Sequence, residues 1–405
     1  MHAVEVRNGI YWVGAVDWPV RDFHGYATPR GTTYNNYLIM DDEVTLVDTV
    51  KHDFWELSRK NIEGRVDPAK IRNVVVNHIE NDHVTSLDKL MSLCPGATIH
   101  ITGRGRQGLE RFFDISGWDL KIVKTGDTLT IGKRTLMFLE TPMLHWPDSM
   151  MTYVREDKVL FSQDGFGQHI ASVERFDDEF TTCESASALQ ESVIDYYANI
   201  LMPFGGIIKS KLAEVQKLGL KIDIIAPDHG VIWRQGAAGV MQSYLDMAAG
   251  KARLRVAIIY DTMWQSTEMM TVSIAQGIAD AGVECKVVKL RSTPMSGAIT
   301  ELWKSRGFLI GTPTLNNIMF PTVAQFLTHL RGLRPKGRTA GAFGSYGWAG
   351  GAVKEAYAEL SRMKLTTFEP GMQVLYRPSA DDARSCYEFG RSFAELVKEE
   401  HKKYE

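Results

Sequence analysis

The sequence predicts two consecutive α/β domains, the second of them a doubly wound parallel sheet, and three observations carry this prediction. The chain has 405 residues, which is enough for two domains of ordinary size. Short apolar segments rich in β-branched residues alternate with segments of helical spacing in both halves. Polar or glycine-containing loops follow several of the strand segments, where ligands bind in sheets of this kind.

Composition and charge narrow the class of protein. Hydrophobic residues make up 44% and charged residues 23%, as in ordinary globular proteins. The formal net charge of −3 lacks the basic footprint of nucleic-acid binding, and no apolar run has the length that spans a bilayer. The start of the chain shows no signal-peptide pattern, and its four cysteines are widely separated. We therefore expect a cytoplasmic protein with reduced thiols and with neither nucleic acid nor membrane as a partner.

The first half of the chain predicts a mixture of strands and helices. Residues 41–42 are typical of a hairpin turn between two strand segments. The spacing predicts strands over 11–13, 37–40, 44–47, 71–76, 98–101, 128–131, 136–139, 158–161 and 222–226, and helices over 54–64, 86–93, 103–113 and 185–218.

The stretch Asn-His-Ile-Glu-Asn-Asp-His at residues 77–83 directly follows the strand segment 71–76. If it stays extended, His78, Glu80 and Asp82 share one face and His83 turns to a neighbouring position. Four groups that can bind metals fall within six residues, and metal sites use this mixture of nitrogen and oxygen ligands. The stretch predicts a metal site, with a solvated polar loop as the alternative.

Three further residues fall at or just after strand segments: His145, Asp164 and His229. Each by itself has an ordinary structural interpretation, because a histidine near a strand is usually held by hydrogen bonds and Asp164 precedes a glycine, as turn residues do. Together with the stretch 77–83 they favour one shared site, since loops at strand ends often carry functional groups.

The second domain is predicted to begin at residue 251, so that the domains span residues 1–250 and 251–405. Strand segments at 255–260, 286–288, 308–310 and 339–343 alternate with helical stretches, including one over 268–281. This alternation predicts a doubly wound parallel sheet with its ligand at the carboxyl ends of the strands.

Three loops at these strand ends predict a flavin site. The loop 262–267 offers hydroxyls and backbone N–H groups at a helix start and has no Lys or Arg, which suits the monophosphate of FMN. Loops 313–317 and 345–350 would flank the ring, with Trp348 stacked on it; the alternative is three ordinary turns with Trp348 as a surface aromatic. The candidate residues are Thr262, Met263, Trp264, Gln265, Ser266, Thr267, Pro313, Thr314, Leu315, Asn316, Asn317, Ser345, Tyr346, Gly347, Trp348, Ala349 and Gly350.

With these motifs the chain resembles the flavodiiron proteins, also called A-type flavoproteins, over essentially its whole length. The resemblance implies a metallo-β-lactamase-like αββα sandwich followed by a flavodoxin-like domain. It also implies two irons bridged by Asp164 and a hydroxide or oxo group. The implied ligands are His78, Glu80 and His145 for one iron and Asp82, His83 and His229 for the other.

Glu80 stands where related hydrolases usually have histidine, and the added carboxylate makes the site harder and more anionic, which suits iron rather than zinc. For His83 the resemblance leaves two alternatives, a ligand or an imidazole replaced on the metal by solvent. Asp48 is a candidate acceptor for a ligand histidine. The candidates for the substrate pocket are His24, Tyr26 and Tyr197.

The resemblance implies reduction of dioxygen to water, or of nitric oxide to nitrous oxide, with electrons passed through FMN. The expected donor is rubredoxin or, as in the branch of the family found in methanogens, a reduced deazaflavin coenzyme. The expected assembly is a head-to-tail homodimer or a dimer of dimers.

Two other classes of protein are compatible with the domain order. A metal-dependent hydrolase of the metallo-β-lactamase superfamily fused to a flavodoxin domain is disfavoured by Glu80. An electron-transfer flavoprotein with an inactive first domain is disfavoured by the complete set of ligands. The choice of gas and of electron donor stays open at the level of sequence.

Overall fold

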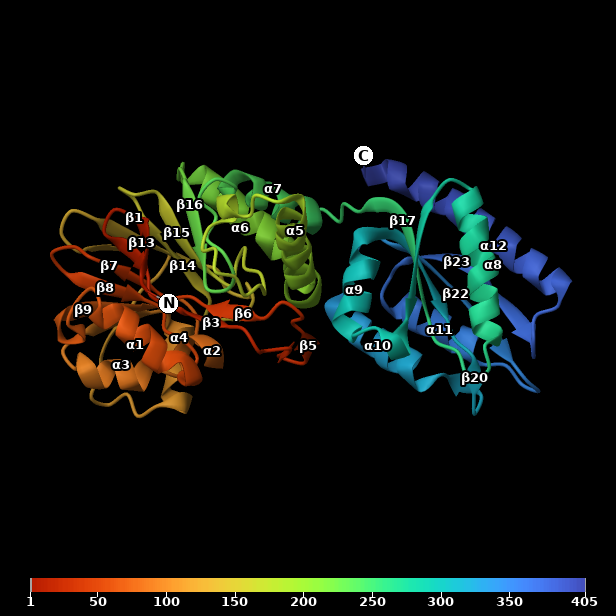
Figure 1. Cartoon of the computed structure of the whole chain (residues 1–405), viewed down its shortest axis with the longest axis horizontal. Coiled ribbons are helices and arrows are strands. Elements are labelled where there is room, and N and C mark those ends of the chain that lie inside the picture. Colours follow the sequence, from red (N-terminus) through yellow and green to blue (C-terminus); the bar gives the residue numbers. More distant parts are fainter. Residues whose placement is uncertain (1, 405) are drawn as a thin grey trace. The chain divides into compact units, whose positions relative to one another are not determined.

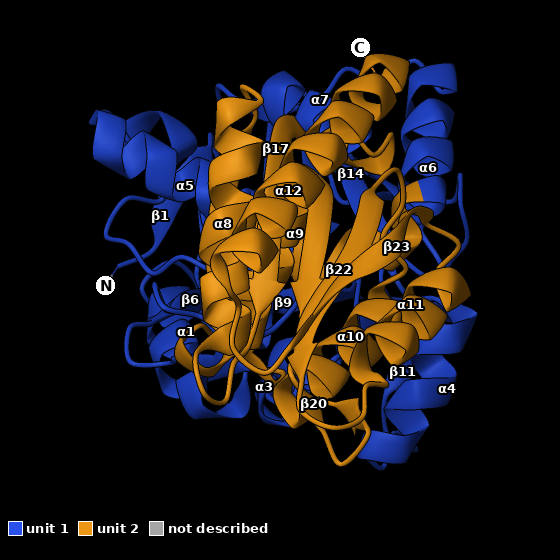
Figure 2. Ribbon diagram, turned by 90° about the vertical axis from the view of Figure 1, so that its right-hand side faces the viewer, with its two compact units in different colours: residues 1–23, 28–196, 206–245 blue, residues 24–27, 197–205, 246–405 orange. Residues whose placement is uncertain are grey.

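The computed structural model describes residues 2–404, which form two compact units (Figure 2). The first unit gathers residues 2–23, 28–196 and 206–245, and the second gathers residues 24–27, 197–205 and 246–404. Both units combine strands and helices, so the predicted α/β class is confirmed. The domain boundary between residues 250 and 251 stays a prediction.

Two sheets form the first unit. The larger has the order β1-β2-β7-β8-β9-β10-β11, and the smaller has the order β12-β13-β14-β15-β16. The strands of the larger sheet are β1 (Val4–Arg7), β2 (Ile10–Trp12), β7 (Tyr37–Ile39), β8 (Val44–Val47), β9 (Ile71–Val76), β10 (Thr98–Ile101) and β11 (Asp119–Ile122). Those of the smaller sheet are β12 (Thr128–Thr130), β13 (Thr135–Glu140), β14 (Met150–Val154), β15 (Val159–Gln163) and β16 (Ile224–Pro227).

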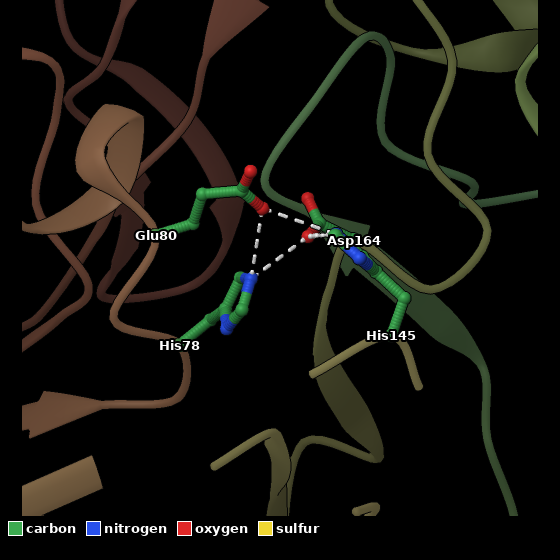
Figure 3. A group of neighbouring side chains, drawn as sticks. All are labelled: His78, Glu80, His145 and Asp164. Atoms are coloured by element: carbon green, nitrogen blue, oxygen red, sulfur yellow. Dashed lines mark hydrogen bonds and ion pairs between the residues drawn. The ribbon is translucent and has the colours of Figure 1, made fainter. Parts of the chain in front are cut away.

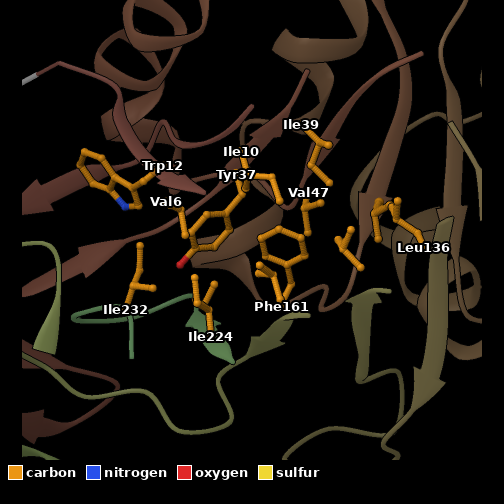
Figure 4. Close-up of a cluster of buried hydrophobic side chains, with 14 of the residues drawn as sticks. Val6, Ile10, Trp12, Tyr37, Ile39, Val47, Leu136, Phe161, Ile224 and Ile232 are labelled. Atoms are coloured by element: carbon orange, nitrogen blue, oxygen red, sulfur yellow. The ribbon is translucent and has the colours of Figure 1, made fainter. Parts of the chain in front are cut away.

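The main core of this unit lies between the two sheets (Figure 4). Tyr37 and Val47 of the larger sheet pack there against Leu136 and Phe161 of the smaller one. Successive side chains of a strand point to opposite faces, so in β9 Val75 joins this core while its neighbours at 74 and 76 join a second core under the helices. Because both faces of β9 are buried over residues 74–76, three valines follow one another there instead of alternating with polar residues.

Helices cover the outer faces of both sheets, which completes an αββα sandwich. Trp55, Leu90 and Leu109 of three helices pack on the larger sheet, and Leu212 and Tyr244 of two others lie beside Leu160 of the smaller one. The helices are α1 (Trp55–Glu63), α2 (Asn81–Val84), α3 (Leu87–Leu93), α4 (Gly103–Phe112), α5 (Cys183–Tyr196), α6 (Gly205–Lys217) and α7 (Ala237–Ala248).

Two expectations for this unit are corrected. The helical region 185–218 is not continuous, because a π-helix (Tyr197–Leu201) and a 3-10 turn (Met202–Phe204) separate α5 from α6. Pro203 lies in that turn, and proline lacks the N–H group that a helix interior needs. Strand β14 was not predicted, although all of its residues are buried between β13 and β15.

The second unit is a parallel sheet of order β18-β17-β19-β22-β23. Figure 1 shows helices α8 and α12 on one face and α9, α10 and α11 on the other, the doubly wound arrangement that was predicted. The elements are β17 (Arg253–Tyr260), α8 (Ser266–Asp280), β18 (Glu284–Lys289), α9 (Met295–Lys304), β19 (Ser305–Gly311), α10 (Pro321–Leu333), β22 (Thr339–Tyr346), α11 (Ala352–Arg362), β23 (Thr366–Leu375) and α12 (Ala380–His401).

Strand β23 was not predicted, because Pro370 and Gly371 in its middle are typical of a turn. It lies at the edge of the sheet, where a proline interrupts no central hydrogen-bond ladder. The short strands are β3 (Ala15–Asp17), β4 (Asp22–Phe23), β5 (Tyr26–Ala27), β6 (Thr32–Tyr34), β20 (Thr314–Leu315) and β21 (Ile318–Met319). Within residues 2–404, no helix combines the length and the apolar character needed to cross a membrane.

Candidate functional site

The stretch 77–83 leaves β9 and turns into a short helix. The stretch does not stay extended, because Glu80 is the N-cap of α2, and Asp82 and His83 lie on that helical turn. An extended chain would place Asp82 on the same face as His78. The helical turn instead directs Asp82 and His83 toward a second group of side chains.

The first group consists of His78, Glu80, His145 and Asp164 (Figure 3). One ligand atom from each lies within 4.8 Å of the others. The Oε2 atom of Glu80 is 3.2 Å from Nε2 of His78 and 3.1 Å from Nε2 of His145. The four side chains therefore converge from three separate loops on one point.

The second group consists of Asp82, His83 and His229, again with one ligand atom each within 4.8 Å of the others. The Oδ2 atom of Asp82 is 3.0 Å from Nε2 of His229 and 3.4 Å from Nε2 of His83. All three residues are buried.

The carboxylate of Asp164 is shared between the two groups. Its Oδ2 atom lies 3.0 Å from Nε2 of His145 and 3.4 Å from Nε2 of His78. Its Oδ1 atom lies 3.2 Å from Nε2 of His83 and 3.4 Å from Nε2 of His229. One oxygen thus faces each group, which is the arrangement that a bridging carboxylate requires.

Outer partners orient the imidazoles, through hydrogen bonds at His78 and His229 and at ion-pair distance at His83. The Nδ1 atom of His78 is 3.0 Å from Oδ2 of Asp148, and the Nδ1 atom of His229 is 2.7 Å from the carbonyl oxygen of Thr33. The Nδ1 atom of His83 is 3.5 Å from Oδ2 of Asp228. Partners that occupy Nδ1 leave Nε2 of each ring to face the two groups, as in metal-binding histidines.

Asp48 does not contact a histidine as was expected. It accepts hydrogen bonds from the backbone N and from Nδ2 of Asn77, both at 2.7 Å, so it holds the residue that precedes the first ligand candidate. Sequence analysis missed the roles of Asp148 and Asp228. Their positions in the loop of His145 and directly before His229 were the available signals.

The histidines and carboxylates of the site shift one another's pKa values. Burial alone would lower the pKa of both His78 and His145, but contacts with neighbouring carboxylates raise it to about 10 for His78 and about 9 for His145. Burial alone would also raise the pKa of Glu80, but hydrogen bonds to His145 and His78 lower it to about 2. For Asp164 burial likewise raises the pKa, but the positive charge of His83 outweighs this effect and holds the pKa well below its usual value.

Several of the nitrogen and oxygen atoms that could bind a metal have no hydrogen-bond partner within the site. Asp82 Oδ1, Asp164 Oδ1 and His83 Nε2 are buried without a hydrogen-bond partner among the described residues. Buried polar groups are nearly always satisfied, so such orphaned atoms require an explanation. Imidazole and carboxylate donors that face one another would be satisfied by two divalent cations.

The three candidates for the substrate pocket lie in the second unit. His24 is exposed, and its ring lies 6.2 Å from that of Tyr26. Tyr197 is fully buried, with its ring 5.6 Å from that of Trp303 and nearly parallel to it. The role of all three in the substrate pocket stays a prediction.

The three loops predicted to hold a flavin follow β17, β19 and β22, which are neighbours in the sheet. Their carboxyl ends therefore lie side by side, and Oγ1 of Thr267 is 2.9 Å from Oγ of Ser345, linking the first loop to the third. In the middle loop Asn316 and Asn317 have positive φ angles of 51° and 63°, at the turn between β20 and β21.

Two aromatic side chains stand clear of the surface at these loops. Trp264 is 83% exposed and Trp348 is 91% exposed, an unusual state for the largest apolar side chain. Nearby, Nε of Arg291 lies 2.8 Å from Oδ1 of Asp261, and its Nη2 donates to the carbonyl of Thr262. Sequence analysis missed this cation because it belongs to a distant turn.

Comparison with known proteins agrees with this arrangement. A family profile described as "ODP family beta lactamase" matches residues 32–230, and the flavodoxin profile matches residues 258–390. A nitric oxide reductase of Moorella thermoacetica is 44% identical over 97% of this chain and 98% of its own length. The anaerobic nitric oxide reductase flavorubredoxin of Escherichia coli is 41% identical over 97% of this chain and 82% of its own.

Solved structures show the same likeness. The flavodiiron protein from Giardia intestinalis has a TM-score of 0.96 and 34% identity, over 100% of this chain and 98% of its own. This chain belongs to the flavodiiron proteins. The rubredoxin oxygen:oxidoreductase from Desulfovibrio gigas has a TM-score of 0.95 and 36% identity, over 98% of this chain and 99% of its own.

Membership in this family confirms the predicted fold names. The first unit of this flavodiiron protein is metallo-β-lactamase-like, and the second is flavodoxin-like. The membership also makes the chain an oxidoreductase of the flavodiiron type.

Proposed function

We propose that this chain reduces a small diatomic gas at a di-iron centre, with FMN in the second unit supplying the electrons. The observation that carries the proposal is the position of Asp164, whose two oxygens face two adjacent groups of imidazoles and carboxylates. A carboxylate shared in this way can hold two metal ions side by side, and the oxygen-rich donor set with Glu80 suits irons that change charge better than zinc.

His78, Glu80 and His145 would hold one iron and Asp82, His83 and His229 the other, with Asp164 between them. When bound, two irons supply redox chemistry that zinc lacks. Three carboxylates in one buried site offset much of the charge of two such cations.

The chain's own residues keep the donors in place. Asp148 accepts from the backbone N of Ile79 at 2.9 Å as well as facing His78, so it fixes both the ring and the loop that carries it. Asp82 and His83 are buried, which limits the access of bulk water to the donor atoms. A fixed ring loses little conformational freedom when it binds a metal.

FMN would bind at the three loops after β17, β19 and β22. Its phosphate would meet the N-terminus of α8 at Ser266 and Thr267, and Trp264 or Trp348 would cover the ring. Electrons would come from rubredoxin or from a reduced deazaflavin coenzyme. The relatives carry names for both gases, nitric oxide and oxygen, so we propose both as substrates, with water and nitrous oxide as products. The head-to-tail homodimer stays a prediction.

Metal analysis followed by anaerobic stopped-flow kinetics tests the proposal. We expect about two irons and one FMN per chain, in accordance with the donor groups and loops. Reduction with rubredoxin or the deazaflavin coenzyme, then mixing with dioxygen or nitric oxide, should reoxidise the flavin. Full activity with zinc alone, in hydrolysis of a lactam or thioester, would overturn the redox function.

The raised pKa values of His78 and His145 predict proton release on metal binding. Below about pH 9 both imidazoles of the metal-free protein are in the charged imidazolium form. Each ring must lose one proton before its Nε2 atom can bind a metal. Loading with ferrous ion at pH 7 should release at least about two protons, and affinity should increase as the pH rises toward 9.

Calorimetry in buffers of different ionisation enthalpy measures this release. The carboxylates of Glu80 and Asp164 release no protons on metal binding, because they are already ionised. Replacing the exposed His52 by glutamine is the control and should leave the number of released protons unchanged. A metal affinity independent of pH in this range would contradict the prediction.

A further inference from the structure

A large basic pocket lies in the second unit at the amino ends of β19, β22 and β23. Its volume is about 840 Å³, within the range of small-molecule sites. Its lining residues include seven Lys or Arg and one carboxylate, Glu400. The whole chain has a formal net charge of −3, so this concentration of positive charge is local and exceptional.

Two of the lining cations are buried. Arg306 is 1% exposed and Arg338 is 3% exposed, and Arg306 Nε and Nη2 and Arg338 Nε have no hydrogen-bond partner among the described residues. The ring of Tyr404 lies 3.9 Å from the guanidinium of Arg306. Burial lowers the pKa of Arg338 to about 9, and the positive charge of Arg306 adds to this effect. Buried guanidinium groups without a counter-ion are costly.

Three further cations surround the mouth. Arg334, Lys336 and Lys364 are exposed, and within residues 2–404 none of them forms an ion pair. By contrast, Arg331 and Arg362 both pair with Glu359, and Glu400 pairs with Lys403 at 2.6 Å. The carboxylates near the pocket are thus already engaged, while the mouth retains unpaired positive charge.

Helix dipoles account for only part of this charge. Helices α10 and α11 end beside the pocket, at Leu333 and Arg362, and cations near helix C-termini are favourable. Arg306 and Arg338 lie instead at the starts of strands and are buried, so a dipole gives no reason for them. Both also donate to backbone carbonyls, Arg306 to that of Gly337 and Arg338 to those of Gly250, Lys336 and Trp303, but neither has a carboxylate partner among the described residues. A bound anion would therefore be attracted by their charge and would contact the exposed cations of the mouth.

We propose that this pocket binds the polyphosphate group of a small molecule. Planar guanidinium groups bind phosphate oxygens bidentately and Lys binds them as a point charge, and charge-assisted hydrogen bonds of this type are strong. A carboxylate or single phosphate would neutralise few of the five cations that have no ion pair among the described residues, whereas a di- or triphosphate chain carries enough negative charge.

The pocket is separate from the flavin loops. β22 connects the two ends of the sheet, and its eight residues span roughly 26 Å at about 3.3 Å per residue. A ligand at the amino ends therefore leaves the loops at the carboxyl ends free, and binding can be measured on the flavin-loaded protein.

Calorimetry with inorganic tripolyphosphate at low ionic strength tests the site. We expect one tripolyphosphate per chain, with affinity reduced about 1,000-fold in the triple variant Arg334→Gln, Lys336→Gln, Lys364→Gln, because each lost contact to a charged group costs about tenfold or more. The matched control removes three exposed cations elsewhere in the unit, Lys354→Gln, Arg384→Gln and Arg391→Gln, and should retain the affinity within about threefold.

The flavin absorbance of each variant reports whether the unit is folded. If the triple variant loses flavin, the single variant Lys364→Gln replaces it, with an expected loss of about tenfold in tripolyphosphate affinity. ATP forms a second arm. Equal affinity for ATP and tripolyphosphate means that the phosphate chain alone is recognised, and tighter ATP binding means that the ligand is a nucleotide; both support the proposal. An absence of binding at millimolar tripolyphosphate, or an equal loss in the control variant, would overturn it.

Discussion

Replacing Asp164 by alanine is expected to release both metal ions and to abolish gas reduction, while the flavin stays bound. Asp164 is the single residue whose two oxygens face both groups, so its loss removes a ligand from each proposed iron. It also leaves the charge of four neighbouring imidazoles less compensated. Even outer partners of metal ligands are worth about 10- to 100-fold in affinity, and a shared ligand exceeds that at both positions.

Iron per chain and flavin absorbance, measured on the same sample, check this expectation. The control is Asp223→Ala, which removes a carboxylate that is 42% exposed at the surface of the same unit and contacts neither group. It should retain iron, flavin and turnover. An Asp164→Ala protein that keeps two irons would refute the shared role of this carboxylate.

Removing the hydroxyls of Ser266 and Thr267 together is expected to weaken FMN binding about 100-fold and to leave the metals in place. The two residues open α8, where backbone N–H groups and the helix dipole favour a phosphate. Thr267 is also 2.9 Å from Ser345, so the double change loosens the first loop from the third. Hydrogen bonds to a charged group are each worth about 1.5–3 kcal/mol, or at least tenfold in affinity.

Flavin fluorescence during titration of the flavin-free protein measures this effect. Ser273→Ala removes a partly exposed hydroxyl from the same helix, further from its start, and should bind FMN normally. Iron content should be equal in all three proteins. If the double variant binds FMN as tightly as the parent, this loop does not hold the phosphate.

Much of the fold could be predicted from local pattern. β9 was recognised as a buried strand from its β-branched residues, since Val74, Val75 and Val76 follow one another and fill cores on both faces of the sheet. β14 and β23 were missed for different reasons. The first opens on two methionines instead of β-branched residues, and the second contains a proline and a glycine that only an edge position tolerates.

The candidate site too was predictable only in part from the sequence. The kinds of residue in the stretch 77–83, and the positions of His145, Asp164 and His229 after strands, were sufficient to predict that these side chains gather in one place. The direction of each side chain was not, because Asp82 reaches the second group only through the turn of α2. The partners Asp148 and Asp228 likewise depend on loops that meet after folding.

By itself, the sequence of this flavodiiron protein determined the order of its elements, the chemical types in its metal groups and the three loops of its flavodoxin-like unit, since these depend on neighbours along the chain. Only the tertiary structure decided which oxygen of Asp164 faces each group, that Asp48 holds Asn77 rather than a histidine, and that basic residues near three strand starts form one pocket. Such contacts join residues far apart in sequence, and their geometry is set by the packing of whole sheets and helices.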